Sequence, residues 1–241
     1  MKPFYLQLTP QIGELVWQQL PSDDLLAMQL AYIQVLQHNF EDKLIECRQG
    51  FTRISLVWKE ETGHYQFQKL LSNLDPEPVK LPEKTWEIPV CYDESLGFDL
   101  MSFCDEKKLT TDQLISLHTG PIYRIHFFGF LPGFFYLHGL PERLHSPRKS
   151  IPSQSVPAGS VAIGGAQTGI YPIESPGGWQ LIGRTPVKTY DVNRKEPILF
   201  KAGDSICFVP ITKHEFERLE ERQMRGENVA IICQEEYGRG H

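Results

Sequence analysis

The chain has 241 residues, 41% hydrophobic and 22% charged, which is the composition of a globular protein with one or two domains. Its formal net charge of −6 argues against a nucleic-acid-binding protein, which would carry a basic face. The absence of an apolar run of about 18 residues, and of a signal-like start, leads us to expect a cytoplasmic protein without a membrane span. Five widely spaced cysteines indicate buried thiols rather than a disulfide framework or a zinc site.

Residues 1–80 are predicted to form a small α+β domain. A short strand is expected over residues 4–8, and Ser22 is a suitable N-cap for a helix that continues to about Leu36. Alternation of apolar residues predicts a half-buried strand over residues 52–58, followed by a helix over 64–74. This order of elements suggests a ferredoxin-like sandwich.

Residues 75–84 are predicted to form a linker, because proline-rich segments are excluded from helices and central strands. A second domain then covers residues 85–241, where short alternating segments are separated by Gly and Pro. Strands are predicted near residues 86–92, 123–128, 160–163, 179–182, 198–200 and 205–209, and helices over 112–118 and 211–225. Many short strands with turn signals between them indicate a β-barrel or sandwich.

The candidate chemistry is concentrated in residues 118–191. This stretch holds 11 of the 19 glycines, 9 of the 18 prolines, and six Lys or Arg residues against three Asp or Glu. The chain has no P-loop, nucleophile-elbow or zinc-protease motif, and the glycine-rich run 164–169 does not precede a predicted helix, which argues against a dinucleotide site.

An unusual run of aromatic residues, glycine and proline spans residues 129–137. Gly129, Pro132 and Gly133 allow a tight turn there, and the surrounding aromatic side chains either fill the barrel or line a ligand site; both interpretations stay open.

Anion binding is the chemistry that the nearby loops favour. Arg148 could hold a carboxylate or phosphate through two hydrogen bonds, although a solvated loop arginine is the simpler interpretation. Backbone amides of Gly177 and Gly178 could form an anion-binding concavity supported by Arg184, or the segment could be a plain hairpin turn.

Two histidines have predicted roles. His118 ends a predicted helix, where it would cap the dipole, and His126 is predicted on the polar face of its strand together with Arg124, at the mouth of a pocket. His126 is therefore the acid/base candidate. The histidine spacings match no standard metal site, so no metal is expected.

Several of these segments together resemble the family of KipI, the 5-oxoprolinase B subunit and allophanate hydrolase subunit 1, over about residues 86–216. The segments that carry the resemblance are His118-Thr119-Gly120, Gly129–Leu137, Pro147-Arg148, Val156–Val161, Thr168–Pro172, Ser175–Trp179, Gly183–Pro186, Gly203-Asp204 and Phe208–Pro210.

The resemblance implies an α+β fold class with an N-terminal α+β domain and a C-terminal cyclophilin-like β-barrel. It also implies a stable complex with a C-type subunit, joined by an A-type subunit, that converts 5-oxo-L-proline to L-glutamate with ATP hydrolysis. The chain alone would then be inactive. Alternative functions are a KipI-type inhibitor of a sensor histidine kinase and a carboxyltransferase or allophanate hydrolase subunit of a urea-degrading system.

The site expected from residues and resemblance together has a catalytic set and a substrate- or anion-binding set. The catalytic set is His126, Arg148 and Arg184. The binding set is Gly129, Pro132, Gly133, Thr168, Gly169, Tyr171, Ser175, Gly177 and Gly178. The chain departs from the family after Pro147-Arg148: where relatives repeat Pro-Arg it has Pro152-Ser153, so a second arginine charge is missing.

Overall fold

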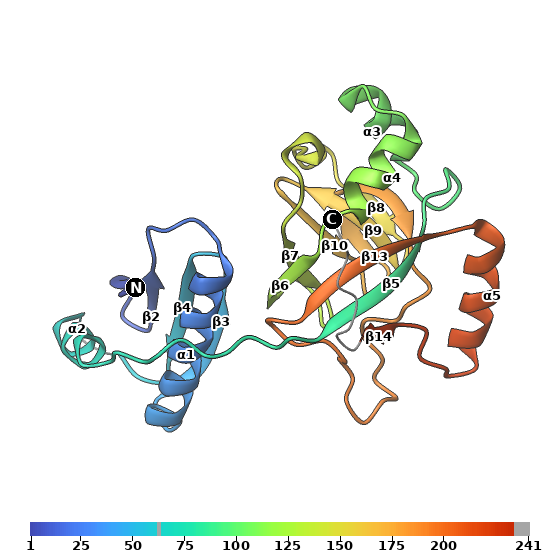
Figure 1. The fold of residues 1–241 in the computed structure, drawn as a ribbon. Helices are drawn as coiled ribbons and strands as arrows, with labels where there is room; N and C mark the ends of the chain where they lie inside the picture. Colours follow the sequence, from blue (N-terminus) through green and yellow to red (C-terminus); the bar gives the residue numbers. More distant parts are fainter. Residues whose placement is uncertain (62–63, 234–241) are drawn as a thin grey trace. The chain divides into compact units, whose positions relative to one another are not determined.

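The computed structural model describes residues 1–61 and 64–233, and it divides into two compact units, Met1–Leu81 and Pro82–His241 (Figure 1). The division falls inside the predicted linker. The last eight residues of the second predicted domain, 234–241, lie outside the described residues. Within those described ranges, no helix is both long and apolar enough to cross a membrane.

The N-terminal unit is one antiparallel sheet with two helices. The strands are β1 (Phe4–Thr9), β2 (Ile12–Val16), β3 (Leu44–Gln49) and β4 (Arg53–Trp58), in the order β1-β2-β4-β3, and the helices are α1 (Asp23–Asn39) and α2 (His64–Ser72). The Ser22 side chain accepts a hydrogen bond from the Leu25 amide, so the predicted N-cap is present. Because β4 lies between β2 and β3, α1 makes a crossover of the split β-α-β kind. The chain order is strand-strand-helix-strand-strand-helix, and the ferredoxin-like description stays a prediction.

The core of this unit explains which strands the sequence revealed. Ile54, Leu56 and Trp58 are buried and alternate with more exposed residues, which is the pattern that predicted β4. The pairing of β3 with β4 shifts register between Leu44 and Glu46. This shift interrupts the alternation of buried and exposed residues along β3, so the strand was not predicted.

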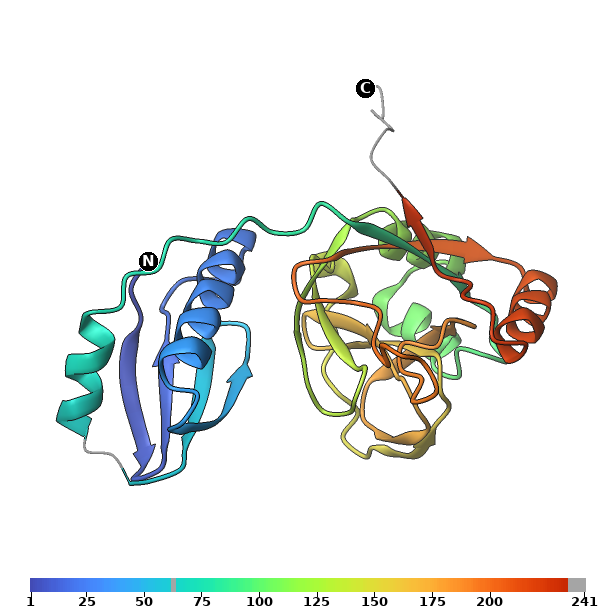
Figure 2. The same cartoon turned by 90° about the horizontal axis from the view of Figure 1, so that it is seen from below.

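The second unit contains a closed barrel, so the predicted barrel is confirmed (Figures 1 and 2). Its seven strands follow the order β12-β9-β10-β7-β6-β13-β5, and pairing of β5 with β12 closes the ring. Their bounds are β5 (Thr85–Cys91), β6 (Tyr123–Phe128), β7 (Phe135–His138), β9 (Ser160–Gly164), β10 (Gln167–Ile170), β12 (Gln180–Arg184) and β13 (Ser205–Ile211). Strand β14 (Ile231–Cys233) adds to β5 outside the ring.

Further elements surround the barrel. The helices are α3 (Leu100–Lys107), α4 (Thr111–Thr119), the short 3₁₀ helix η1 (Glu142–Leu144) and α5 (Lys213–Met224). Strands β8 (Ser153–Val156) and β11 (Ser175–Gly177) form a separate two-stranded ribbon. The strand predicted over residues 198–200 is wrong: this segment is irregular and pairs with no strand of the barrel, and its Phe200 ring packs into the core against Trp86 and Phe135, at centroid distances of 4.9 and 5.3 Å.

Alternation along the barrel wall produces two apolar clusters. Val161, Ile163 and Ile182 belong to the large barrel core, whereas Ala162 and Leu181, their neighbours in sequence, belong to a second cluster with Phe134, Tyr171 and Trp179. Since successive strand residues face opposite sides, this second cluster lies on the outer surface of the wall. The candidate site is built on it.

Candidate functional site

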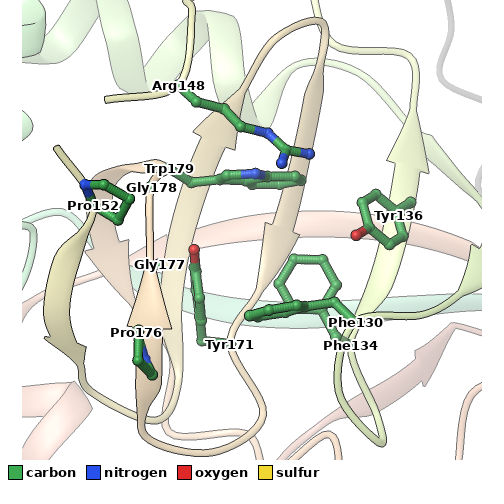
Figure 3. Close-up of a pocket in the computed structure, with 10 residues that line it drawn as sticks. All are labelled: Phe130, Phe134, Tyr136, Arg148, Pro152, Tyr171, Pro176, Gly177, Gly178 and Trp179. Carbon is green, nitrogen blue, oxygen red and sulfur yellow. The ribbon is translucent and has the colours of Figure 1, made fainter. Parts of the chain in front are cut away.

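A cavity of about 250 Å³ opens on the outer surface of the barrel wall (Figure 3). It is lined by Phe130, Phe134, Tyr136, Arg148, Pro152, Tyr171, Pro176, Gly177, Gly178 and Trp179. These residues come from the loop before β7 and β7 itself, the Arg148 loop, the end of β10, the β8–β11 ribbon and the segment that leads into β12. The volume is below the roughly 300–1,000 Å³ typical of sites for drug-sized ligands, which suits a smaller molecule.

Aromatic rings form most of the cavity wall. Phe134 is at the centre, with ring centroids 5.6 Å from Phe130, 5.1 Å from Tyr136, and 5.4 Å from both Tyr171 and Trp179. Most of these pairs meet edge to face, the arrangement that aromatic quadrupoles favour. Such mutual packing fixes the rings, so the wall is preformed.

Arg148 is the single charged side chain among the ten lining residues. Its guanidinium carbon lies 5.9 Å from the centroid of the Trp179 ring, and Figure 3 shows the group over the indole. In residues 1–61 and 64–233 no acidic side chain pairs with it, whereas the neighbouring Lys149 pairs with Asp99 at 2.6 Å. The guanidinium is thus available to a ligand anion.

The two tyrosine hydroxyls supply hydrogen-bonding groups beside the guanidinium. Burial raises the pKa of both Tyr136 and Tyr171, and the nearby Arg148 charge lowers these pKa values by less. Both groups therefore stay protonated at neutral pH and can donate a hydrogen bond. In Figure 3 the two hydroxyls point into the cavity.

Gly177 is required by the Tyr171 side chain. A Cβ atom at position 177 would lie 2.3 Å from the Tyr171 hydroxyl oxygen, whereas one at Gly178 would meet nothing closer than 3.8 Å. Gly169 has a similar role on β10, because a Cβ there would lie 2.9 Å from the Phe135 carbonyl oxygen and 3.3 Å from the Phe134 ring. The glycines make room for rings that form the wall.

The structure brings four predicted site residues together in the cavity lining: Arg148, Tyr171, Gly177 and Gly178. Three others shape the adjoining loop. The Gly129 carbonyl accepts a hydrogen bond from the Leu131 amide, Pro132 is exposed, and Gly133 adopts a φ of +80° close to Tyr190.

Thr168 and Ser175 lie outside the lining. Thr168 is fully buried in the barrel, where its hydroxyl donates to the Ala162 carbonyl and lies 2.9 Å from Nε2 of His118. Ser175 pairs with Val156 in the ribbon, and within the described parts of the chain its buried hydroxyl contacts no hydrogen-bond partner.

His126 differs from its predicted placement on the polar face. It is fully buried, beside the His138 ring at a centroid distance of 4.9 Å, and it does not line the cavity. A register shift between Ile125 and Phe127 makes His126 the extra residue of a β-bulge. Phe128 rather than Phe127 then packs on the barrel core, so the alternation used to place His126 does not hold.

Arg184 also lies outside the lining. Its Nε donates to the Ala158 carbonyl at 2.8 Å, its guanidinium lies 3.8 Å from the Glu220 carboxylate, and it packs over the Phe216 ring. These contacts attach β12 to α5, which leaves Arg148 as the arginine that faces the cavity.

The sequence-based set omitted six lining residues: Phe130, Phe134, Tyr136, Pro152, Pro176 and Trp179. The available signal was the aromatic density of residues 129–137, which left open whether the rings fill a core or line a site. The structure shows that the rings do both, because Phe134 is buried in the outer cluster and also lines the cavity.

Ser153, at the position where the family resemblance predicts an arginine, contacts a neighbouring cation. It accepts a hydrogen bond from Lys149 Nζ at 3.1 Å, and it is not among the lining residues. Lys149 thus places a positive charge beside position 153, although the side chain at that position carries none.

Metal and thiol chemistry gain no geometric support from the described residues. Across residues 1–61 and 64–233, no cluster of three or more His, Cys, Asp or Glu side chains is arranged to hold a metal ion. Cys91 and Cys104 are buried, and burial raises the pKa of the half-buried Cys47 thiol to about 11, which disfavours a reactive thiolate. The side chain of Cys233 lies outside the described residues.

Comparison with known proteins identifies relatives of this architecture. Residues 13–200 match the model of the carboxyltransferase domain, subdomain C and D. The chain is 52% identical over 170 residues to the 5-oxoprolinase B subunit of Escherichia coli O157:H7, covering 69% of this chain and 78% of that protein. It is 51% identical over 123 residues to the 5-oxoprolinase B subunit of Haemophilus influenzae, covering 51% of this chain and 58% of that one.

Two solved structures show the same fold. The crystal structure of TTHA0988 matches with a TM-score of 0.71 and 32% identity, over 83% of this chain and 40% of that longer chain. Urea carboxylase of Kluyveromyces lactis matches with a TM-score of 0.77 over 95% of this chain and 23% of that one; at 18% identity this likeness concerns the fold alone.

Proposed function

This chain belongs to the carboxyltransferase domain family, subdomains C and D, and we propose that it acts as the B subunit of an ATP-dependent 5-oxoprolinase. In this proposal it assembles with A-type and C-type subunits, and the complex hydrolyses 5-oxo-L-proline to L-glutamate. Two relatives named as 5-oxoprolinase B subunits, at 51% and 52% identity, support the role.

One observation carries the proposal: an arginine without an acidic partner among the described residues lies at the edge of a small aromatic cavity. A guanidinium binds a carboxylate through two parallel hydrogen bonds. The faces of Phe134 and Trp179 offer apolar contact for a compact ring, and 5-oxoproline consists of such a ring bearing one carboxylate.

The residues of this chain would bind and orient the substrate. Arg148 would hold the carboxylate, and the hydroxyl of Tyr136 or Tyr171 would donate to the lactam oxygen. Phosphorylation of that oxygen by ATP would make the amide carbon more electrophilic and prepare it for attack by water.

The cavity has too little positive charge to bind the triphosphate of ATP. Enzymes hold a triphosphate with several cationic groups and a metal ion, whereas the lining offers one guanidinium. We therefore place the ATP site on a partner protein of the complex, and on this basis the chain alone is expected to be inactive.

The test replaces the B subunit of the E. coli 5-oxoprolinase with this chain, in co-expression with the other E. coli subunits, and measures ATP-dependent glutamate formation. Arg148→Ala should lower kcat/KM about 10- to 100-fold, because a hydrogen-bonded contact to a charged group contributes about 1.5–3 kcal/mol. Arg143→Ala, which removes an exposed arginine of η1, is the matched control and should have no effect. An assembled complex without turnover, or with full activity after Arg148→Ala, would contradict the proposal.

A further inference from the structure

We propose that the cavity selects a cyclic carboxylate whose ring carries no positive charge, and that it rejects a zwitterionic amino acid of the same size. The inference rests on the proposed function, because it concerns the ligand of the same cavity. It adds that the cavity distinguishes ligands by the charge on the ring.

The charges of the lining carry the argument. Among its ten residues, Arg148 is the one charged side chain, and none is Asp or Glu. A ligand ammonium would lose its hydration, meet no counter-charge and be repelled by the guanidinium. Attraction to the ring faces is too weak to compensate for both costs.

Acidic side chains on the neighbouring loops are already engaged. The Asp99 carboxylate pairs with Lys149 at 2.6 Å and accepts a hydrogen bond from the Leu181 amide at 2.7 Å. The Glu174 carboxylate accepts from the Ser155 hydroxyl at 2.7 Å. Turning either carboxylate toward an ammonium in the cavity would break these contacts.

The uncharged groups of the lining suit a lactam. The hydroxyls of Tyr136 and Tyr171 can donate to a carbonyl oxygen, and burial raises the pKa of both, which keeps the protons in place. A ring amide presents a neutral N–H and a carbonyl, so it can occupy the aromatic walls without bringing a cation.

Hydrolysis itself then changes the ligand from an accepted to a rejected species. Once ATP has phosphorylated the lactam oxygen, water adds to the lactam carbonyl carbon, the bond from that carbon to the ring nitrogen breaks, and the nitrogen takes up protons to become an ammonium. A second water then releases the phosphoryl group as inorganic phosphate and leaves the new carboxylate. The product has a second carboxylate and a positive charge, so the cavity should release it.

The test measures binding to the intact chain by calorimetry with five probes. L-5-oxoproline and tetrahydrofuran-2-carboxylate both carry a carboxylate on an uncharged ring and should bind. L-proline, which has a charged ring nitrogen, and 2-pyrrolidinone, which has no carboxylate, should each bind at least tenfold more weakly. L-glutamate should bind as weakly as L-proline.

Three results would overturn the inference: L-proline binding within threefold of L-5-oxoproline, tetrahydrofuran-2-carboxylate binding as weakly as L-proline, or no binding of any probe. The second result would mean that the lactam carbonyl, rather than the nitrogen charge, is recognised. Arg148→Met should weaken L-5-oxoproline binding at least tenfold, whereas the control Arg143→Met should leave it unchanged.

The outcomes separate this inference from the proposed function. Selective binding without turnover in the assembled complex would sustain the selectivity and reject the enzyme role. The complex could instead turn over L-5-oxoproline but be inhibited by L-proline at concentrations near the KM for L-5-oxoproline. That result would support the enzyme role and reject the selectivity.

Discussion

Thr168 and Gly169 are neighbours in β10 with opposite surroundings. Thr168 faces the barrel interior, where the Tyr92 hydroxyl, the His118 ring and the Thr168 hydroxyl form a chain of hydrogen bonds with distances of 2.7 and 2.9 Å. Because the Thr168 hydroxyl donates to the Ala162 carbonyl, it accepts from Nε2–H of His118, and Nδ1 accepts from Tyr92. Gly169 faces outward, beneath the rings of the cavity.

His118 should make the stability of the barrel depend on pH. Burial lowers its pKa from about 6.5 to about 3, so the unfolded state binds the proton first as the pH falls. The contribution of neutral His118 is fully present above pH 6.5 and is lost as the pH falls toward 3, with a slope of about 1.4 kcal/mol per pH unit.

Urea unfolding at pH 6.5 and pH 5 should therefore show the wild type losing about 2 kcal/mol more than His118→Gln over that interval. Equal losses in the two proteins would show that His118 is not the titrating group.

Gly177→Ala should disturb the cavity, whereas Gly178→Ala should not. The new Cβ at 177 would overlap the Tyr171 ring, and such overpacking typically costs about 1–3 kcal/mol. The free energy of unfolding and L-5-oxoproline affinity should both fall for Gly177→Ala and stay near wild type for Gly178→Ala. Similar values for the two variants would mean that Tyr171 moves aside freely.

How far individual site residues could be predicted depended on the local pattern. Arg148, Tyr171, Gly177 and Gly178 lie in recognisable loop motifs, and all four line the cavity. The position of His126 could not be predicted from alternation, because a β-bulge inserts a residue at that point and sequence gives no sign of it.

At the scale of elements, one ion pair joins three segments around the cavity. Asp99, at the start of α3, pairs with Lys149 beside Arg148, and its carboxylate also accepts from the Leu181 amide in β12. Lys149 in turn donates to Ser153 in β8, and its amide bonds the Gly178 carbonyl. The loop that presents Arg148 is thereby attached to the barrel wall and the ribbon.

Lys149→Met should loosen this attachment. Both partners are less than one-fifth exposed, so an unpaired Asp99 carboxylate should cost about 1–3 kcal/mol of folding free energy. L-5-oxoproline affinity should fall as well, because Arg148 would lose its fixed position. Lys188→Met, at an exposed lysine, is the control, and an equal response in both variants would reject a specific role for Lys149.

Four of the barrel-unit strands that prediction missed share a physical cause. β7, β8, β10 and β11 have three or four residues each, and β10 and β11 contain glycine or proline, so they are too short for a reliable alternation. The longer strands β5, β6 and β13 and the capped helix α5 were predicted within a few residues of their ends. Pairing across the barrel, rather than local preference, stabilises the short strands.

At the scale of the whole molecule, the two units have separate apolar cores. Leu25, Ile54 and Trp58 belong to the core of the first unit, and Ile88, Tyr123 and Ile206 to that of the second. The proline-rich segment 75–84 was predicted from sequence as the connection, because proline in that density excludes regular elements. The positions of the strands around the barrel depend on contacts distant in sequence and could not be predicted in the same way.

Limited proteolysis should therefore cut first within residues 75–84 and leave two resistant fragments. Exposed segments without regular structure are the preferred cleavage sites, whereas each core protects its own unit. Mass spectrometry of the early fragments is the measurement. Early cleavage inside either unit, with the segment intact, would contradict the separation of the cores.

The pairing of β5 with β12, which closes the barrel, has a consequence for folding during synthesis. β5 is the first strand of the second unit, yet its partners β12, β13 and β14 all lie near the other end of that unit. During synthesis, roughly ninety further residues must follow residues 85–91 before a strand that pairs with β5 has been made. The N-terminal unit, in contrast, has all its strands by residue 58. The apolar first strand is exposed throughout that interval, which makes the nascent barrel the stage at which chaperones would be needed.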